Sequence, residues 1–458
     1  MAPGKSFDMA EEFADLDFNS IRVENRFIRT METLGKQTDT SIWYSSENRA
    51  EAKAIYRMLG NDGFDREEII RVHREATIKR MAEYGGPILA VQDTTGVNYN
   101  NHLKTEGIGY ISDKTLGVNV HSCLAVTSDG LVLGVLDQSG YNRSEAKDES
   151  ASHDSKKVRP IEEKESWRWL ETLERSTADI PEGIPVITVC DREGDMYELF
   201  AKAEEREEAF LIRIVQNRMT VENKRILDEI RKKRCQGRLG VTIPRDSRSS
   251  IPEREAVFQM RYAPFTVKRP HILNPIQTLP QSIEVQVIYV KEEHPPKGKG
   301  PIEWFLMTNE LINTVEEAYE YVGYYMQRWK IERFHYVLKS GCAIEKLQER
   351  SIEKTVALIL MYSIIAGKIL NMTYMGRLKP EASCSALLGP DEWKLLYCIA
   401  NKGKKEPKKP YTMKEAVEYL GWLGGPKRAP SDGPPGVKTI WIGLMKLYIL
   451  LAYREYLA

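Results

Sequence analysis

Five polar side chains recur on one face of a predicted helix in the second half of the chain. Tyr325, Arg328, Glu332, Tyr336 and Lys339 stand at offsets of zero, three, seven, eleven and fourteen residues, which is the spacing of one helical face. DNA repels a carboxylate that lies among phosphate-binding groups unless a cation lies between them. The face therefore predicts that Glu332 holds a metal ion and that its neighbours hold a nucleic-acid backbone.

Two aspartates are predicted to end apolar strands elsewhere in the sequence. The run 87–93 ends at Asp93 and a turn is predicted after it, while the run 184–191 ends at Asp191. Sites in open α/β sheets lie at the carboxyl edge of the strands. One such aspartate alone would more often be a turn former or a helix cap. The functional interpretation therefore depends on both aspartates acting together with Glu332.

Three convergent carboxylates repel one another unless a cation neutralises them, and hard oxygen ligands select Mg²⁺ or Mn²⁺ rather than zinc. Two such ions can activate a water or a 3′-hydroxyl and can stabilise the leaving oxygen of a phosphodiester. The chemistry that the sequence predicts is therefore metal-dependent phosphoryl transfer.

The elements around these residues indicate an α/β fold, because strands and helices alternate between residues 87 and 215. We expect three regions. They are an N-terminal helical domain (1–65), a catalytic core (66–370) with a β-rich insertion at about 235–310, and a C-terminal helical domain (371–458).

The amino-acid composition excludes few classes of function. The 458 residues carry 66 Lys and Arg against 66 Asp and Glu, a balance that neither demands nor excludes a nucleic-acid partner, since local clusters decide binding. The six cysteines lack CxxC spacing, which gives a zinc site little support and fits reduced thiols. The two most apolar segments, 356–367 and 440–451, are too short to span a bilayer. We therefore expect no membrane partner.

The motifs together resemble the bacterial insertion-sequence transposases of the IS-four superfamily, of the transposon-five type. The matching pieces are Gln92-Asp93-Thr-Thr, Val189-Cys-Asp191-Arg-Glu-Gly-Asp195, and the Tyr-x2-Arg-x3-Glu-x6-Lys signature formed by Tyr325, Arg328, Glu332 and Lys339. The resemblance implies an RNase H-like mixed sheet flanked by helices. It also implies a DDE triad, an N-terminal DNA-binding domain and a C-terminal dimerisation domain.

The resemblance also implies a role for each matched residue. Asp93, Asp191 and Glu332 would be the catalytic ligands of two Mg²⁺ ions, for which Mn²⁺ can substitute. The implied DNA contacts are Tyr325, Arg328 and Lys339 on phosphates, Trp304 on a flipped base, Arg213 on the strand after Asp191, and Arg26, Lys36 and Arg57 in the N-terminal domain. Tyr336 departs from the family, whose closest members place a lysine there.

The resemblance implies a cut-and-paste DNA transposase that opens transposon ends through a DNA hairpin and joins them to target DNA. The family acts as a homodimer on two double-stranded DNA ends in the bacterial cytoplasm. Trp441, Leu444, Tyr448 and Leu451 share one helical face, which is either the dimer contact or ordinary core. The alternatives are an RNase H-like nuclease without strand transfer, a non-catalytic DNA-binding relative and, more distantly, a glycoside hydrolase.

Overall fold

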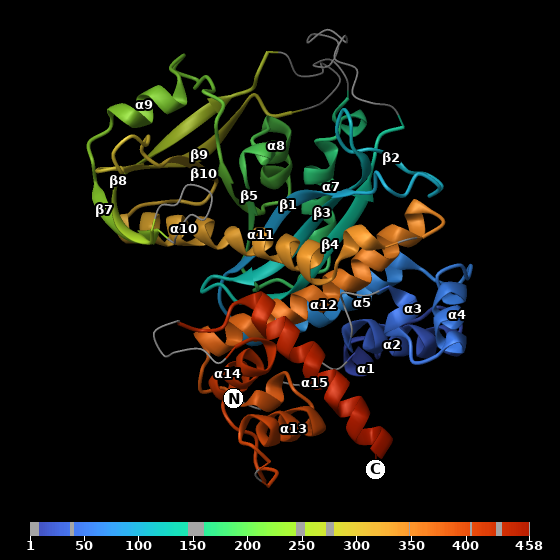
Figure 1. Ribbon diagram of the computed structural model, residues 1–458. Coiled ribbons are helices and arrows are strands. Elements are labelled where there is room, and N and C mark those ends of the chain that lie inside the picture. Colours follow the sequence, from blue (N-terminus) through green and yellow to red (C-terminus); the bar gives the residue numbers. More distant parts are fainter. Residues whose placement is uncertain are drawn as a thin grey trace.

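A ten-stranded mixed sheet runs through the molecule in the computed structural model (Figure 1), in the order β2-β3-β1-β5-β6-β10-β9-β8-β7 with β4 paired to β3. The structure describes residues 9–36, 41–144, 160–243, 252–271, 279–347, 349–403, 405–426 and 433–457. The strands are β1 (Ile88–Asn98), β2 (Gly109–Tyr110), β3 (Leu116–Thr127), β4 (Val132–Tyr141), β5 (Val186–Cys190), β6 (Ala209–Arg213), β7 (Gly237–Ile243), β8 (Arg254–Lys268), β9 (Ser282–Glu292) and β10 (Glu303–Thr308).

The first half of the sheet combines an antiparallel meander with two parallel strands. β1 pairs antiparallel with β3, which pairs antiparallel with β4, whereas β5 is parallel to β1 and β6 is parallel to β5. Parallel neighbours need long crossovers, and here these crossovers contain the helices α7 (Trp167–Thr177) and α8 (Tyr197–Glu205). The predicted strands and helices of this region are confirmed.

The β-rich segment continues the same sheet. β10 pairs antiparallel with β6, and β9, β8 and β7 follow outward in antiparallel order. A short helix, α9 (Ile226–Lys232), precedes these strands and contacts β8 and β9. The β-rich segment is therefore hydrogen-bonded, through β10, to the strand that follows Asp191.

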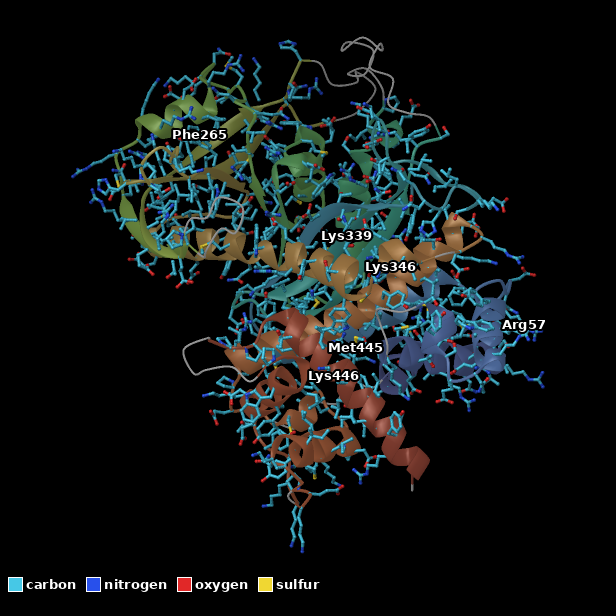
Figure 2. The ribbon with its side chains drawn as sticks, in the orientation of Figure 1. Arg57, Phe265, Lys339, Lys346, Met445 and Lys446 are labelled. Atoms are coloured by element: carbon cyan, nitrogen blue, oxygen red, sulfur yellow. The ribbon has the colours of Figure 1, made fainter. Side chains whose placement is uncertain are left out.

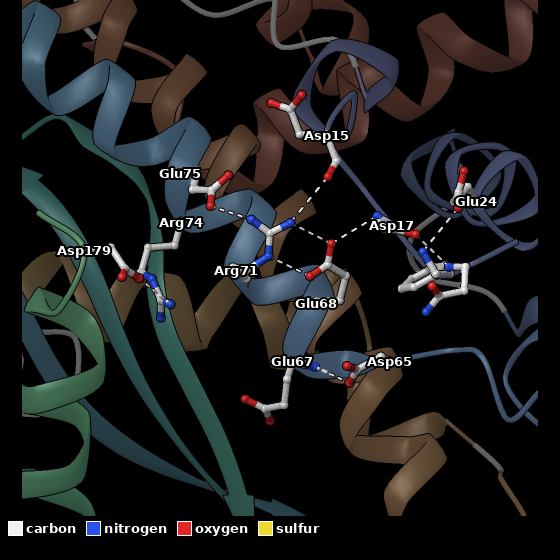
Figure 3. Close-up of polar contacts among 12 residues, drawn as sticks. Asp15, Asp17, Glu24, Asp65, Glu67, Glu68, Arg71, Arg74, Glu75 and Asp179 are labelled. Atoms are coloured by element: carbon white, nitrogen blue, oxygen red, sulfur yellow. Dashed lines mark hydrogen bonds and ion pairs between the residues drawn. The ribbon is translucent and has the colours of Figure 1, made fainter. Parts of the chain in front are cut away.

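In the described part of the chain before the sheet, the helices are α1 (Met9–Glu12), α2 (Ile21–Lys36), α3 (Ile42–Ser45), α4 (Arg49–Met58) and α5 (Arg66–Tyr84). Polar contacts fasten the N-terminal segment to α5 (Figure 3). Arg71 donates to Glu68 and Glu75 and also, at 3.4 Å, to the backbone carbonyl of Asp15. The backbone N–H of Asp17 donates to Glu68 at 3.0 Å. The N-terminal helices are thereby held to the helix that leads into β1.

Glu12 lies deeper in the same junction. Its carboxylate accepts from His73 Nδ1 at 2.6 Å and from Arg80 Nη1 at 2.8 Å, while Arg80 Nε donates to the backbone carbonyl of Leu133 in β4. Burial opposes the charge, but His73 and Arg80 together lower the pKa of Glu12 to about 2. This buried carboxylate thus links α1, α5 and the sheet.

Helices make up most of the C-terminal region, as the sequence predicts: α12 (Ile352–Leu378), α13 (Pro390–Ala400), α14 (Met413–Gly424) and α15 (Val437–Leu457). α12 is apolar and long enough to cross a membrane by length and composition alone, but 94% of its most apolar window is buried inside the molecule. On α15, Trp441 and Leu444 pack inside their own chain, whereas Ile449 and Tyr453 are exposed. The predicted apolar stripe of α15 therefore serves the core of the chain at its first two positions.

Candidate active site and nucleic-acid interface

Asp93 and Asp191 stand at equivalent positions on neighbouring parallel strands. The last parallel pair between β1 and β5 is Val91 with Val189, and each aspartate lies two residues farther along. Asp191 directly follows β5, as predicted, and its Oδ1 accepts the backbone N–H of Glu193 at 2.8 Å. The structure therefore brings the two aspartates to one place on the sheet.

The predicted strand end and turn at Asp93 are wrong. β1 continues to Asn98, and Asp93 pairs with Ser122 of β3 inside the strand. Pairing with β3 extends β1 beyond the point where its pairing with β5 stops. Asp93 is therefore held by β3 on one side, while its other side faces the site.

Glu332 reaches the same site from a helix on the sheet's face. The predicted single helix over 325–339 is divided into α10 (Val315–Gln327), α11 (Trp329–Tyr336) and a π turn (Val337–Gly341) that contains Lys339. Arg328 caps both α helices at their junction. The sequence also predicts an apolar stripe beside the polar face, formed by Tyr324, Ile331, Phe334 and Leu338. The last three are fully buried, whereas Tyr324 is only partly buried. This packing fixes the side of the helix on which Glu332 and Arg328 lie.

Arg328 connects the carboxylates. Its Nη2 donates to Glu332 Oε1 at 2.6 Å, and its Nη1 lies 3.7 Å from Asp93 Oδ2. Burial and then the negative charges of Asp191 and Glu332 together raise the pKa of Asp93 to about 7, against the opposing effects of the Thr94 backbone N–H and Arg328. The three predicted carboxylates therefore belong to one electrostatic group with too little positive charge.

These residues meet the chemical requirement for a hard divalent cation, since all three offer carboxylate oxygens in a region that lacks positive charge. Within the described ranges, however, no three His, Cys, Asp or Glu side chains are already close enough to form a metal-binding group. The ion pair between Arg328 and Glu332 is one reason why the three carboxylates do not form such a group, because it engages one of them. The donor chemistry fits, whereas the ligand geometry is not assembled.

Sequence reasoning missed the residues that support the aspartates. Arg168 on α7 donates to Thr94 Oγ1 at 3.1 Å and to Glu193 at 2.9 Å, and so joins the residue after Asp93 to the segment after Asp191. Thr94 also contacts His121 Nδ1 at 2.8 Å. No motif marks Arg168 as a neighbour of either aspartate, because the contact exists only after α7 packs on the sheet.

His335 also lies beside the site, and sequence reasoning missed it. It is buried, with Nδ1 4.0 Å from Asp93 Oδ2. Burial and then the charges of Lys339 and Arg328 together lower its pKa to about 3, so the ring is neutral at physiological pH. Its position three residues after Glu332 is the signal that could have placed it beside the site.

An aromatic series extends from the carboxylates toward the outer strands. Tyr325 is buried, and its ring contacts Trp304 edge-to-face at 5.4 Å between centroids. Trp304 stacks in turn against Phe258 of β8 at 6.5 Å. Arg328 lies over the Tyr325 ring at 5.9 Å, and the charge of Arg213 acts on the pKa of Tyr325. The structure therefore brings Tyr325, Arg328, Trp304 and Arg213 together at one end of the site.

The N-terminal residues of the prediction lie away from the carboxylates. Arg26 is half-buried on α2, Lys36 is exposed at the end of α2, and Arg57 is exposed on α4. In Figure 2, Lys339, Lys346 and Arg57 follow one another from the centre of the molecule to its N-terminal helices on the right. Arg57 lines a hollow of about 1080 Å³ between α4, the 100–105 loop and the start of α12. Its basic residues are Lys53, Arg57, Lys104, Arg350 and Lys354.

Comparison with protein families identifies both ends of the chain. Residues 9–64 match the family described as transposase DNA-binding, and residues 364–457 match the transposase Tn5 dimerisation domain. The chain carries a transposase DNA-binding domain and a Tn5-type dimerisation domain. The presence of these two domains supports the interpretation of the chain as a DNA transposase that binds DNA and dimerises. The two domains flank the sheet that holds the carboxylates.

Among solved structures, the chain is similar to a piggyBac transposase in a synaptic complex with hairpin DNA. The TM-score is 0.36 and the sequence identity is 10%, over 79% of this chain and 69% of that one. A likeness of this size carries no argument about mechanism.

Proposed function

We propose that the chain is a cut-and-paste DNA transposase of the transposon-five type. The observation that carries the proposal is the convergence of Asp93, Asp191 and Glu332 on a sheet flanked by a transposase DNA-binding domain and a Tn5-type dimerisation domain. Three carboxylates that share one negative region suit phosphoryl transfer, in which cations must offset charge on the ligands and on the phosphate. The proposed reaction is cleavage of transposon ends followed by their transfer to target DNA.

The strand order supports an RNase H-like core. β4-β3-β1-β5-β6 combines three antiparallel strands with two that are parallel to β1. In this order Asp93 on the central strand and Asp191 after its parallel neighbour come to one edge, which Glu332 reaches from α11. The proposed DDE triad thus draws one residue from each of three elements.

Asp93, Asp191 and Glu332 are the residues that would hold Mg²⁺ or Mn²⁺. When bound, such ions supply a nucleophile of lowered pKa and stabilise the leaving oxygen. Arg328 holds Glu332 at 2.6 Å, so cation binding has to compete with this ion pair. A guanidinium released from Glu332 is free to bind a DNA phosphate, the role that we propose for Arg328 in the complex.

The proposed DNA path runs from the aromatic end of the site to the N-terminal helices. Trp304 has a partly exposed ring supported from below by Phe258, as a platform for an unstacked base requires. Tyr325 contacts this ring and feels the charge of Arg213, while the charge of Lys339 acts on His335 beside Asp93. The hollow beside Arg57 offers five cations to the backbone of the same duplex. A stacked, unpaired base is the feature that suits a hairpin intermediate.

The test uses duplexes taken from the DNA on either side of the coding sequence, incubated with the full chain and Mg²⁺ or Mn²⁺. We expect wild type to cut at an end, to form a hairpin from a pre-nicked end and to join the product to a second duplex. Asp191→Asn should lose all three products while it still binds DNA. Asp179→Asn is the matched control, because Asp179 is half-exposed, lies ahead of β5 and pairs only with Arg74 among the described contacts.

Each outcome decides between the candidates. Cut ends without hairpins or joined products would favour a nuclease without strand transfer. DNA binding by a wild type that is silent with both metals would favour a non-catalytic relative. Equal activity of Asp191→Asn and wild type would remove Asp191 from the reaction.

A further inference from the structure

The basic hollow beside Arg57 contains one acidic side chain. Lys53, Tyr56 and Arg57 of α4 line one wall, and Glu349, Arg350 and Lys354 line another. The loop that contains His102 and Lys104 closes the third side. A carboxylate has no obvious place in a surface that binds phosphates, since it repels them.

The chain fixes the position of Glu349. Its backbone carbonyl accepts from Thr105 Oγ1 at 3.0 Å, and the backbone N–H of Glu106 donates to the next carbonyl, that of Arg350, at 2.8 Å. Ser351 then caps α12 by accepting from the backbone N–H of Lys354. The segment is thus held between the 100–105 loop and α12, and Glu349 is part of the wall of the hollow.

Charged groups from both walls face Glu349. Lys354 and Arg350 act on it from its own side, and its charge acts on the Tyr56 hydroxyl across the hollow. Lys354 also reaches the N-terminal helices, because a β-carbon added at Gly60 would lie 3.0 Å from its Nζ. The remaining titratable groups of the walls are Lys53, Arg57, His102 and Lys104. Glu349 is the one acid among these lining groups.

Resting on the proposed function, we propose that Glu349 sets how strongly the hollow holds a DNA phosphate, weakly when its carboxylate is ionised and strongly when it is protonated. An ionised Glu349 neutralises one of the cations that a phosphate needs and repels the phosphate itself. A protonated Glu349 removes this repulsion and offers an O–H donor. The carboxyl group thereby makes the affinity of the hollow for DNA depend on pH.

The surroundings of Glu349 place its change of charge near neutral pH. Burial outweighs the charges of Lys354 and Arg350, so that the pKa of Glu349 is raised to about 7. A phosphate in the hollow adds negative charge and raises this pKa further, so DNA binding takes up a proton. Affinity should therefore fall by roughly five- to tenfold as the pH rises from about 6 to about 8.

The test measures binding of the full chain to a duplex of about 20 base pairs of arbitrary sequence at low salt without divalent metal, where phosphate contacts dominate. Glu349→Gln should bind about five- to tenfold tighter than wild type at about pH 8 and should vary by less than about twofold over the range. Glu353→Gln is the matched control, because it removes the same charge from an exposed residue four positions later, at the start of α12. It should keep the wild-type fall.

A second measurement uses the wild type alone. Calorimetric titration in buffers of different ionisation enthalpy should show uptake of up to about one proton on binding at about pH 7.5, and Glu349→Gln should lose this uptake. His102 is the other lining group that could make the DNA affinity depend on pH. If Glu349 is responsible, His102→Gln should retain the fall in DNA affinity above neutral pH.

A wild-type affinity that does not vary with pH would overturn the inference, as would a Glu349→Gln profile that follows wild type. Loss of the fall in His102→Gln would also overturn it. Because binding is measured without metal, a failure of cleavage would refute the proposed function while these profiles still decide the role of Glu349.

Discussion

Replacing Glu12 with Gln should loosen the DNA-binding domain from the sheet. Glu12 is 6% exposed and joins α1 to His73 and Arg80 on α5. His73 Nε2 accepts the backbone N–H of Val135 at 3.1 Å, so the ring proton lies on Nδ1 and is donated to Glu12. Burial lowers the pKa of His73, which keeps the ring neutral. Arg80 therefore supplies the positive charge that balances Glu12.

The expected loss of unfolding free energy follows from the pKa of Glu12, which falls from 4.5 to about 2 on folding. A lowered folded-state pKa means that the carboxylate contributes its full stabilisation above about 4.5 and loses it as the pH falls through about 2. The difference corresponds to about 3 kcal/mol at neutral pH. It agrees with the roughly 3–5 kcal/mol that removing one partner of a buried ion pair costs.

The assay is urea unfolding of wild type and Glu12→Gln at about pH 7 and about pH 3, with hydrogen exchange followed in residues 9–36. The gap in unfolding free energy should be about 3 kcal/mol at the higher pH and less than half of that at the lower pH. Exchange should accelerate first in α1 and α2. His73 destabilises both proteins at low pH in the same way. In the unfolded chain its ring takes up a proton below its ordinary pKa of 6.5, whereas burial lowers this pKa in the folded protein.

Asp15→Asn is the matched control. Asp15 pairs with Lys79 at 3.6 Å, but both side chains are mostly exposed, at 68% and 71%. Such a pair contributes less than about 1 kcal/mol. If Glu12→Gln cost no more than Asp15→Asn, or if its cost were unchanged at about pH 3, the assignment of the stabilisation to the Glu12 charge would be refuted.

Two further predictions concern the active site and the C-terminal helices. Arg168→Gln should slow metal-dependent cleavage by roughly tenfold at unchanged DNA affinity, because Arg168 positions the segments after both aspartates; an unchanged rate would remove that role. Gly443→Ala should lower unfolding stability by about 1–3 kcal/mol or more, since the added β-carbon would lie 2.0 Å from the carbonyl oxygen of Leu420 on α14. Thermal unfolding measures this loss. Gly367→Ala, whose added β-carbon meets nothing within 4 Å, should leave the stability unchanged in the same measurement.

Local patterns in the sequence predicted most of the secondary structure and the apolar stripe of the helix that bears Glu332. Ile331, Phe334 and Leu338 repeat at helical spacing, so their burial follows from periodicity. The same periodicity did not show that the helix changes to a π turn at Val337. That change depends on how the helix end packs on the core, which is not encoded in spacing alone.

The error at Asp93 has a different cause. Thr94-Thr-Gly has turn-forming composition, and local propensity favoured a strand end there. In the structure these residues pair with β3, from Thr94 with His121 to Asn98 with Gly117. Pairing across a hairpin outweighs local turn preference, because each paired residue satisfies its backbone groups. The sequence indicated that Asp93 and Asp191 lie together at the sheet, but it did not indicate how Asp93 is held.

The contacts of Arg168 and Glu349 could not be predicted for a related reason. Arg168 carries no signal in the sequence, since Thr94 and Glu193 are brought to it only by the packing of α7. Glu349 lies in a stretch where acidic and basic residues alternate, and such charges are usually solvated on the surface. Its importance depends on the opposite wall, which residues about 290 positions earlier in the chain supply.

Two carboxylates at the junction of the N-terminal helices and the core shift their pKa values in opposite directions, and the contrast has a physical cause. Glu12 accepts short hydrogen bonds from His73 and Arg80, so its ionised form is stabilised in spite of burial. Among the described residues, the charges of Lys354 and Arg350 oppose the effect of burial on Glu349 but do not overcome it. The first carboxylate stays ionised and holds the junction together. The second can change its charge near neutral pH, and a bound phosphate would shift it toward the protonated form.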